Sequence, residues 1–206
     1  MKKINFTDPH RKKHFDHFNK MDQPHFSLVA NVDITDFLKT IKEKQWLFTP
    51  YMVYILTRAA NEIKTFRWRI RGEEIVEHPS VQPSFSVPTD VSDVFSFCTV
   101  NYHPKADIFI KDALETMERM RTAPDFEDEE GRDDFLFMSA IPWVTFTSLT
   151  HAMHHSPVDS VPRITWGKYF EQNGRIMMPL AVQAHHALVD GRNMGEYFEK
   201  VEGLLG

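Results

Sequence analysis

The sequence has a single cysteine and no long apolar run, and each scarcity excludes a class of protein. Cys98 has no second cysteine to pair with, and a lone thiol is typical of a reducing compartment. No stretch approaches the roughly 18 apolar residues that would span a bilayer. The N-terminal segment MKKINFTDPHRKKHF has basic residues but no apolar core after them, so it lacks the pattern of a secretory signal. We therefore expect a cytoplasmic protein with no membrane partner.

The chain also lacks an excess of positive charge. The chain has 24 Lys and Arg against 29 Asp and Glu, for a formal net charge of −5, and it shows no lysine–arginine stripe. We therefore expect no nucleic-acid partner. At 206 residues the chain is long enough for one domain with a substantial core, and no internal repeat divides it. The acidic segment 124–134 (PDFEDEEGRDD) suits a solvated loop or helix end. We expect a single domain over residues 1–206.

Segments with helical and strand patterns alternate along the chain. Caps followed by apolar residues at helical spacing predict helices, with Asp8 and Thr49 as N-caps that each precede a proline. The expected helices are residues 8–18, 49–63, 106–120 and 191–205. Strand patterns cover residues 26–34 and 135–149, with an irregularity or an edge at Pro142, and two more strands joined at Asn173-Gly174 within 163–186. This mixture predicts a two-layer α/β sandwich with a large mixed β-sheet.

Eleven histidines raise the question of a metal site, and two groups of them are close in sequence. The groups are His10, His14 and His17, spaced to share one face of the first expected helix, and His151, His154 and His155. Neither group contains HExxH, and Cys98 completes no ligand set. We favour surface histidines and expect no metal.

The segment AHHALVDG, residues 184–191, has two adjacent histidines at the end of an apolar strand. By alternation Leu180, Val182, Ala184 and His186 share one face of that strand, and His185 lies on the other. A histidine at a strand end can present a nitrogen into a crevice. The pattern leaves three roles open for the pair: metal ligands, a buried structural pair, or an acid–base group. Asp190 is also open, because it could cap the last helix, orient a histidine or pair with an arginine.

A resemblance to a known family narrows these alternatives. HHALVDG fits the HxxxDG signature of CoA-dependent acyltransferases, whereas the DHRxxDG form usual in dihydrolipoamide acyltransferases is absent. The segments HRKKHFDHF, VDITDFLKTIK, SAIPWVTFTS and GKYFEQNGRIMMPLAVQAHHALVDG follow in order. Together they resemble the chloramphenicol acetyltransferases along nearly the whole chain.

The resemblance implies a reaction and an assembly. His186 would be the general base that takes the proton from an acceptor hydroxyl, which attacks the thioester of acetyl-CoA directly, without an acyl-enzyme. Ser139 would donate a hydrogen bond to the oxyanion, and Thr165 would hold a water nearby. Family members form homotrimers with active sites at the subunit interfaces, and each sheet is extended by a neighbour. Acetyl-CoA would be a co-substrate.

The resemblance also assigns supporting roles. Asp190 would pair with Arg11 of the first helix and hold the active-site region in shape. Lys168 and Tyr169 would lie beside bound CoA, with an exposed charge and a half-buried strand aromatic as the alternative.

The acceptor region departs from the family pattern. Arg192-Asn193-Met194 follows Asp-Gly, where family members commonly have Phe-His-Val, and Pro24-His25-Phe26 replaces a segment that often contains cysteine. The 17 phenylalanines would suit an apolar aromatic pocket. Chloramphenicol is the first expected acceptor, and another small hydroxylated molecule is its rival. A carrier-bound or lipoyl-like acceptor, and a non-catalytic trimeric binding protein, are the further alternatives.

Overall fold

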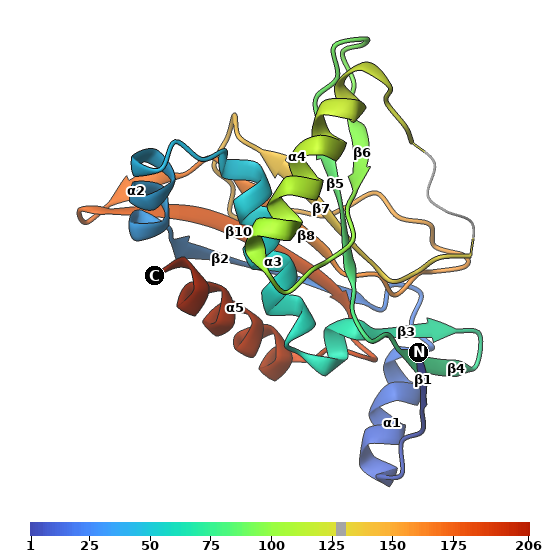
Figure 1. Cartoon of the computed structure of the whole chain (residues 1–206). Helices are drawn as coiled ribbons and strands as arrows, with labels where there is room; N and C mark the ends of the chain where they lie inside the picture. The colour runs from blue at the N-terminus through green and yellow to red at the C-terminus, as the bar shows by residue number, and fades with distance from the viewer. Residues whose placement is uncertain (127–130) are drawn as a thin grey trace.

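A large mixed β-sheet with helices on one face forms the body of the molecule (Figure 1). The computed structural model describes residues 1–126 and 131–206; residues 127–130 of the acidic segment lie outside the described residues. The sheet has seven strands in the order β2-β10-β8-β7-β5-β6, with β9 paired to β10. The pairs β5–β7 and β7–β8 are parallel, and the other pairs are antiparallel. The predicted two-layer α/β sandwich with a mixed sheet is confirmed.

The strands of this sheet are β2 (His25–Asp33), β5 (Gln82–Val87), β6 (Ser96–Thr99), β7 (Phe135–Ile141), β8 (Arg163–Gly167), β9 (Phe170–Gln172) and β10 (Arg175–His185). A second sheet, which the sequence patterns did not predict, has the order β1-β4-β3, with β1 (Lys2–Ile4), β3 (Trp68–Arg71) and β4 (Glu74–Glu77). The helices are α1 (Pro9–Phe18), α2 (Thr35–Glu43), α3 (Phe48–Asn61), the short 3-10 helix η1 (Lys64–Arg67), α4 (Ala106–Thr122) and α5 (Gly191–Leu205).

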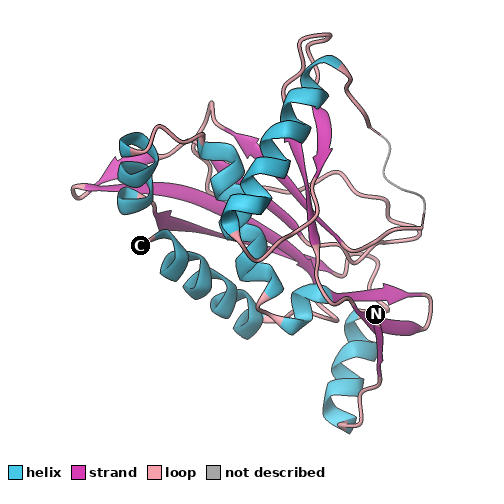
Figure 2. Cartoon of the chain, in the orientation of Figure 1, coloured by secondary structure: helices cyan, strands magenta, loops and turns pink. Residues whose placement is uncertain are grey.

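The two faces of the large sheet differ in chemistry. Helices α3, α4 and α5 lie together on one face (Figures 1 and 2), and the strand residues that point to them are apolar and buried. Those residues are Phe85, Val87, Cys98, Leu136, Met138, Ile164, Trp166, Leu180, Val182 and Ala184. Their neighbours in sequence, which include Ser139, Arg163, Thr165 and Gln183, point to the opposite face because side chains alternate along a strand.

Of the two N-caps predicted from the sequence, one is confirmed and one is wrong. The Asp8 side chain accepts from the backbone N–H of Arg11 at the start of α1, as predicted. The predicted cap Thr49 is wrong: α3 begins one residue earlier, at Phe48, with Leu47 as an N-cap that makes no side-chain hydrogen bond. Pro50 is tolerated there because first-turn N–H groups have no helical acceptor. The stripe Met194, Tyr197, Phe198 and Val201 of α5 is buried as predicted.

Turn chemistry sets the strand ends. Asn173 and Gly174 have φ of 52° and 76° and join β9 to β10, so the predicted hairpin is confirmed. The strand pattern over 135–149 is wrong beyond Ile141, where β7 ends immediately before Pro142. Proline has no N–H to give to a sheet, so the ladder stops there. No helix in residues 1–126 or 131–206 has the length and apolar composition that crossing a bilayer would need.

Candidate active site

Ser139 and Thr165 meet on adjacent parallel strands. They are register partners of β7 and β8, and their hydroxyl oxygens are 2.7 Å apart, so one hydroxyl donates to the other. Thr165 is fully buried and Ser139 is half-buried. A hydroxyl held in this way keeps a fixed direction, which suits a donor that must meet a developing charge.

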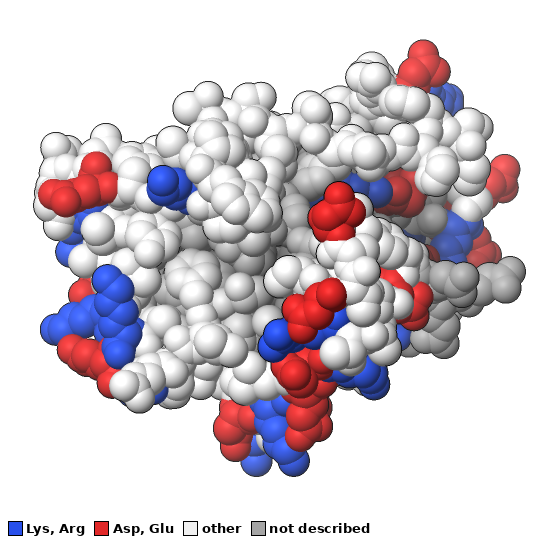
Figure 3. Space-filling view, turned by 90° about the horizontal axis from the view of Figure 1, so that it is seen from above, with Lys and Arg blue, Asp and Glu red and all other residues white. Residues whose placement is uncertain are grey.

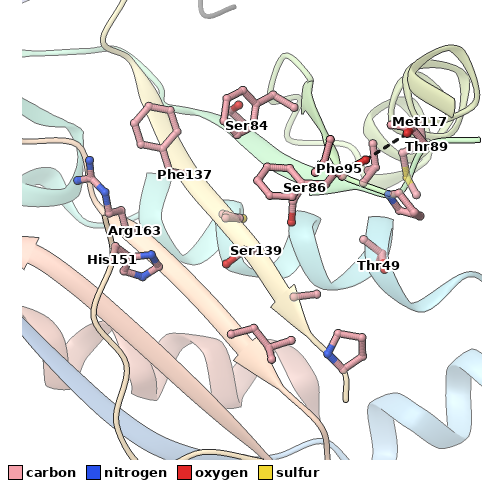
Figure 4. Close-up of a pocket in the computed structure, with 18 of the residues that line it drawn as sticks. Thr49, Ser84, Ser86, Thr89, Phe95, Met117, Phe137, Ser139, His151 and Arg163 are labelled. Atoms are coloured by element: carbon pink, nitrogen blue, oxygen red, sulfur yellow. Dashed lines mark hydrogen bonds between the residues drawn. The ribbon is translucent and has the colours of Figure 1, made fainter. Parts of the chain in front are cut away.

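Ser139 opens into a cavity of about 980 Å³ that extends from the open face of the sheet to the ends of α3 and α4. The cavity runs from Arg163 and His151 at one end, past Phe137 and Ser139, to the region of α3, α4 and the β5–β6 hairpin at the other (Figure 4). Its wall there is mostly apolar, with Val94, Phe95, Phe97 and Met117. Seen from above, the molecule is hollowed near its centre, and most charged side chains lie toward the rim (Figure 3).

His186 follows the last residue of β10 and is held by aromatic rings. Its backbone N–H donates to the carbonyl of Pro24 over 2.8 Å. Its imidazole stacks on Phe18 of α1, with ring centroids 3.9 Å apart and planes at 12°, and Phe26 of β2 lies 4.5 Å away. The Nδ1 atom of His186 is buried without a hydrogen-bond partner in the described part of the chain. The ring is therefore oriented by packing and keeps an unused nitrogen.

His14 lies beside this imidazole, although the sequence suggested only a surface histidine there. Its ring centroid is 5.7 Å from that of His186, and its Nδ1 is 2.9 Å from Nη1 of Arg11. Burial lowers the pKa of His14, and the charge of Arg11 lowers it further. A neutral His14 adds no positive charge next to His186.

Arg11 and Asp190 are not joined directly. Arg11 donates to the carbonyl of Leu188 over 2.8 Å, and no ion pair within 4.0 Å links its guanidinium to Asp190 in the described structure. Asp190 caps α5 in a capping box, in which its carboxylate accepts from the N–H of Asn193 and its own N–H donates to the Asn193 side chain. Burial lowers the pKa of Arg11 and the Asp190 charge opposes that shift, so the two interact only through space. The predicted pair therefore has no direct contact in this chain, and the Asp190 carboxylate caps α5 through Oδ1 instead.

Within one chain, His186 lies far from the hydroxyl pair Ser139–Thr165. Thr165 pairs with Ala181 of β10, and His186 lies five positions beyond Ala181, which is about 16 Å at the usual rise of a strand. The hydroxyl pair points to the open face of the sheet, whereas His186 packs at the end of the strands on Phe18 and Phe26. His186 is not among the residues that line the cavity. Within one chain, His186 and the hydroxyl pair therefore lie at two separate places.

A polar cluster that the sequence patterns missed lies next to the hydroxyl pair. Arg163 is two residues before Thr165 on the same face of β8, and its Nη1 and Nη2 donate to the Asp159 carboxylate over 3.0 and 2.6 Å. His151, predicted to be a surface histidine, lines the cavity beside Arg163 (Figure 4). The rings of His185 and His25 contact each other, with centroids 5.1 Å apart. Burial lowers the pKa of His25, His151 and His185 to about 4 in each case, so all three are neutral at pH 7.

Comparison with known proteins identifies the family. The family model described as "Chloramphenicol acetyltransferase" matches residues 1–202. The chain belongs to the chloramphenicol acetyltransferase family. A chloramphenicol acetyltransferase of Proteus mirabilis is 32% identical over 192 residues, which cover 93% of this chain and 88% of the relative. A solved chloramphenicol acetyltransferase superposes with a TM-score of 0.87 at 25% identity, covering 98% of both chains. The cubic core of the pyruvate dehydrogenase multienzyme complex shares the fold, with a TM-score of 0.68 at 17% identity over 98% of this chain and 91% of its own.

The remaining predicted residues of this family member lie on its surface. Lys168 and Tyr169 connect β8 to β9; both side chains are exposed, and the Tyr169 ring centroid is 6.4 Å from that of Phe48. Their predicted contact with CoA stays a prediction. Within residues 1–126 and 131–206, no three His, Cys, Asp or Glu side chains are grouped to hold a metal ion. His154 and His155 are exposed, in contrast to His151.

Proposed function

We propose that this chain transfers the acetyl group of acetyl-CoA to a hydroxyl of a small acceptor, with chloramphenicol as the first candidate. The observation that carries the proposal is the hydroxyl pair Ser139–Thr165, which opens into a large cavity in a member of the chloramphenicol acetyltransferase family. The protein would act as one catalytic domain over residues 1–206. The lone buried thiol Cys98, whose pKa burial raises to about 12, is unreactive and suits a cytoplasmic location.

His186 is the proposed general base. A hydroxyl is a weak nucleophile at neutral pH, and removal of its proton during attack contributes roughly 10²–10⁴-fold. The imidazole takes this proton as the acceptor oxygen attacks the thioester carbonyl, and it returns the proton to the leaving CoA thiolate. Stacking on Phe18 supports this role, because contact with the ring face fixes the plane of the imidazole and uses neither ring nitrogen.

Ser139 is the proposed donor to the oxyanion of the tetrahedral intermediate. Such a donor typically contributes about 3 kcal/mol to the stability of the transition state. Thr165 would fix the Ser139 hydroxyl and hold a water beside it. The 2.7 Å contact between the two oxygens supports this division of work.

A homotrimer is the proposed working form, with His186 of one subunit facing the cavity of the next. The separation of His186 from Ser139 within a chain supports it. Strand β2 is an edge strand of the large sheet and exposes 42% of Leu28, so it offers both backbone and apolar surface to a neighbour. The exposed Lys168 and Tyr169 are the proposed contacts of CoA, since an ammonium group can meet a phosphate and an aromatic ring can stack on a base.

Release of free CoA thiol from acetyl-CoA with chloramphenicol as acceptor tests the proposal. The wild type should release thiol, and His186→Ala should lose at least about 100-fold in turnover while it keeps its melting temperature. His10→Ala, an exposed histidine on the same helix as Phe18, is the matched control and should behave as wild type.

Two other outcomes are informative. Release with a different hydroxylated acceptor but not with chloramphenicol would keep the reaction and change the acceptor. Full activity of His186→Ala would contradict the mechanism, and absence of release with every hydroxylated acceptor would contradict the proposed function.

A further inference from the structure

The open face of the large sheet is polar next to Ser139. Arg163 of β8 and Gln183 of β10 are register partners, and both point to this face, as do Ser139 and Thr165. Successive residues on one face of a strand are about 6.6 Å apart, so Arg163 lies one such step from Thr165. The segment that follows β7 covers this polar area, because Asp159 binds Arg163 and Met153 accepts from Gln183.

His151 is the member of this area with unused hydrogen-bonding capacity. Its Nε2 atom is buried and has no partner in the described part of the chain, although the residue lines the cavity. A buried polar atom left without a partner is unfavourable, because it has lost its hydrogen bonds to water and gained none in return. Neither ring nitrogen of His151 has a hydrogen-bond partner in the described part of the chain, so this cavity-lining imidazole can bond with a group that arrives with the ligand.

The charges around His151 favour an uncharged partner. Arg163 is the nearest cation, and Asp159 already neutralises it through two hydrogen bonds. His25 and His185 are neutral, like His151 itself. A hydroxyl or an amide can bond with the neutral imidazole without burying a charge, whereas a carboxylate would have to lose its hydration.

We propose that the His151–Arg163 end of the cavity binds a second, uncharged hydrogen-bonding group of the acceptor, such as a hydroxyl or an amide, while the hydroxyl to be acetylated lies at Ser139. This inference rests on the proposed function and refines its acceptor. It adds to the expected apolar aromatic pocket a polar end, at His151, opposite the apolar end at Phe95 and Met117.

A matched pair of acceptors tests the inference. The compounds 2-(4-hydroxyphenyl)ethanol and 2-(4-methylphenyl)ethanol have the same shape and differ only in a hydroxyl or methyl group at the end remote from the reacting alcohol. Acetylation of the alkyl hydroxyl would be followed by chromatography of the product, with chloramphenicol as a third acceptor. The wild type should favour the hydroxyl compound by about tenfold in kcat/KM, as expected for one hydrogen bond to a buried group.

Three variants separate recognition from folding. His151→Leu should lose this preference or reverse it, and His151→Gln, whose amide can replace Nε2, should keep much of it. His154→Leu, an exposed histidine of the same segment, should keep the wild-type ratio. The ratio of kcat/KM for the two probe alcohols in the wild type tests the inference without any variant.

The outcomes distinguish the two proposals. Turnover of chloramphenicol with equal rates for the two probes, or with no turnover of either, would overturn the inference and leave the proposed function standing. An unchanged preference in His151→Leu would also overturn it. No acetylation of any of the three acceptors would contradict the proposed function in its present form, and the inference that rests on it.

Discussion

Ser139 can serve as an oxyanion donor because Thr165 limits where its hydroxyl points. Both side chains come from strands in the middle of the sheet, where paired backbones hold the Cα atoms in place. Their oxygens are 2.7 Å apart, and Thr165 is fully buried. A donor on a rigid element needs little reorganisation when the charge develops, which is the condition under which such a contact stabilises a transition state most.

We expect Ser139→Ala to lower kcat by roughly 100-fold, with a much smaller change in KM, because its contact strengthens only when the carbonyl becomes an oxyanion. Steady-state kinetics with acetyl-CoA and a hydroxylated acceptor measure both constants. Ser148→Ala, at an exposed serine, is the control and should match the wild type. An effect confined to KM would remove Ser139 from this role.

Asp190 is the N-cap of α5, so we expect its substitution to change the stability of that helix. Replacement of an N-cap by alanine typically costs about 1 kcal/mol, whereas asparagine caps as well as aspartate. If capping is its main role, Asp190→Asn should keep the free energy of unfolding within a few tenths of a kcal/mol and Asp190→Ala should lose about 1 kcal/mol. Chemical denaturation measures both. An equal loss in the two variants would show that the charge, and so its interaction with Arg11, matters more than the cap.

Regular elements were predictable because their signals are local. The cap at Asp8, the turn at Asn173-Gly174 and the buried stripe of α5 each depend on a few neighbouring residues, and all are confirmed. The break expected at Pro142 is confirmed, but the strand predicted beyond it is wrong, and so is the cap predicted at Thr49, because α3 begins one residue earlier.

The candidate site was predictable only in part, because its contacts join residues that are far apart in the sequence. His186, Ser139 and Thr165 were named through a resemblance that covers whole segments. The setting of His151 depends on Asp159, Arg163 and Gln183, which come from a loop and two strands. A histidine near His154 and His155 in sequence gives no local sign of this, so its burial could be found only from the fold.

Stability across the whole molecule should depend on pH through three histidines, of which His185 is buried and His25 and His151 are half-buried. Burial lowers the pKa of His25, His151 and His185 from 6.5 to about 4. Between these values the unfolded chain binds protons that the folded chain does not, so the free energy of unfolding falls as the pH falls from about 6.5 to 4. The pKa of Asp159 is lowered, so the loss of its ion pair belongs to still lower pH.

Urea denaturation at fixed protein concentration, at several pH values from 7.5 to 4.5, measures this slope. His151→Leu should make the slope shallower, because one of the three titrating groups is gone, and His154→Leu should leave it unchanged. Equal stability at pH 7.5 and 4.5 in the wild type would mean that the three imidazoles are not buried in the neutral form.

Because His186 and Ser139 lie at two separate places in one chain, a trimer could join them across a subunit interface. In a cyclic trimer each subunit gives the same surface to one neighbour and receives the other surface from the second. If His186 of one subunit completes the cavity of the next, then each active site needs one intact His186 and one intact Ser139, from different chains. Two inactive variants would then carry complementary halves of the site.

We therefore expect activity to return when His186→Ala and Ser139→Ala chains are co-expressed in equal amounts. A site has both groups intact when the Ser139→Ala chain supplies its imidazole and the His186→Ala chain supplies its hydroxyl. With equal amounts of the two chains, random assembly gives this arrangement in about a quarter of sites. Thiol release by the purified mixed trimers should approach that fraction of the wild-type rate, above the residual activity of Ser139→Ala. Two variants mixed only after separate assembly should stay at the average of their own rates unless subunits exchange. A co-expressed sample no more active than that average would mean that His186 and Ser139 act within one chain, and that the chain must move to bring them together.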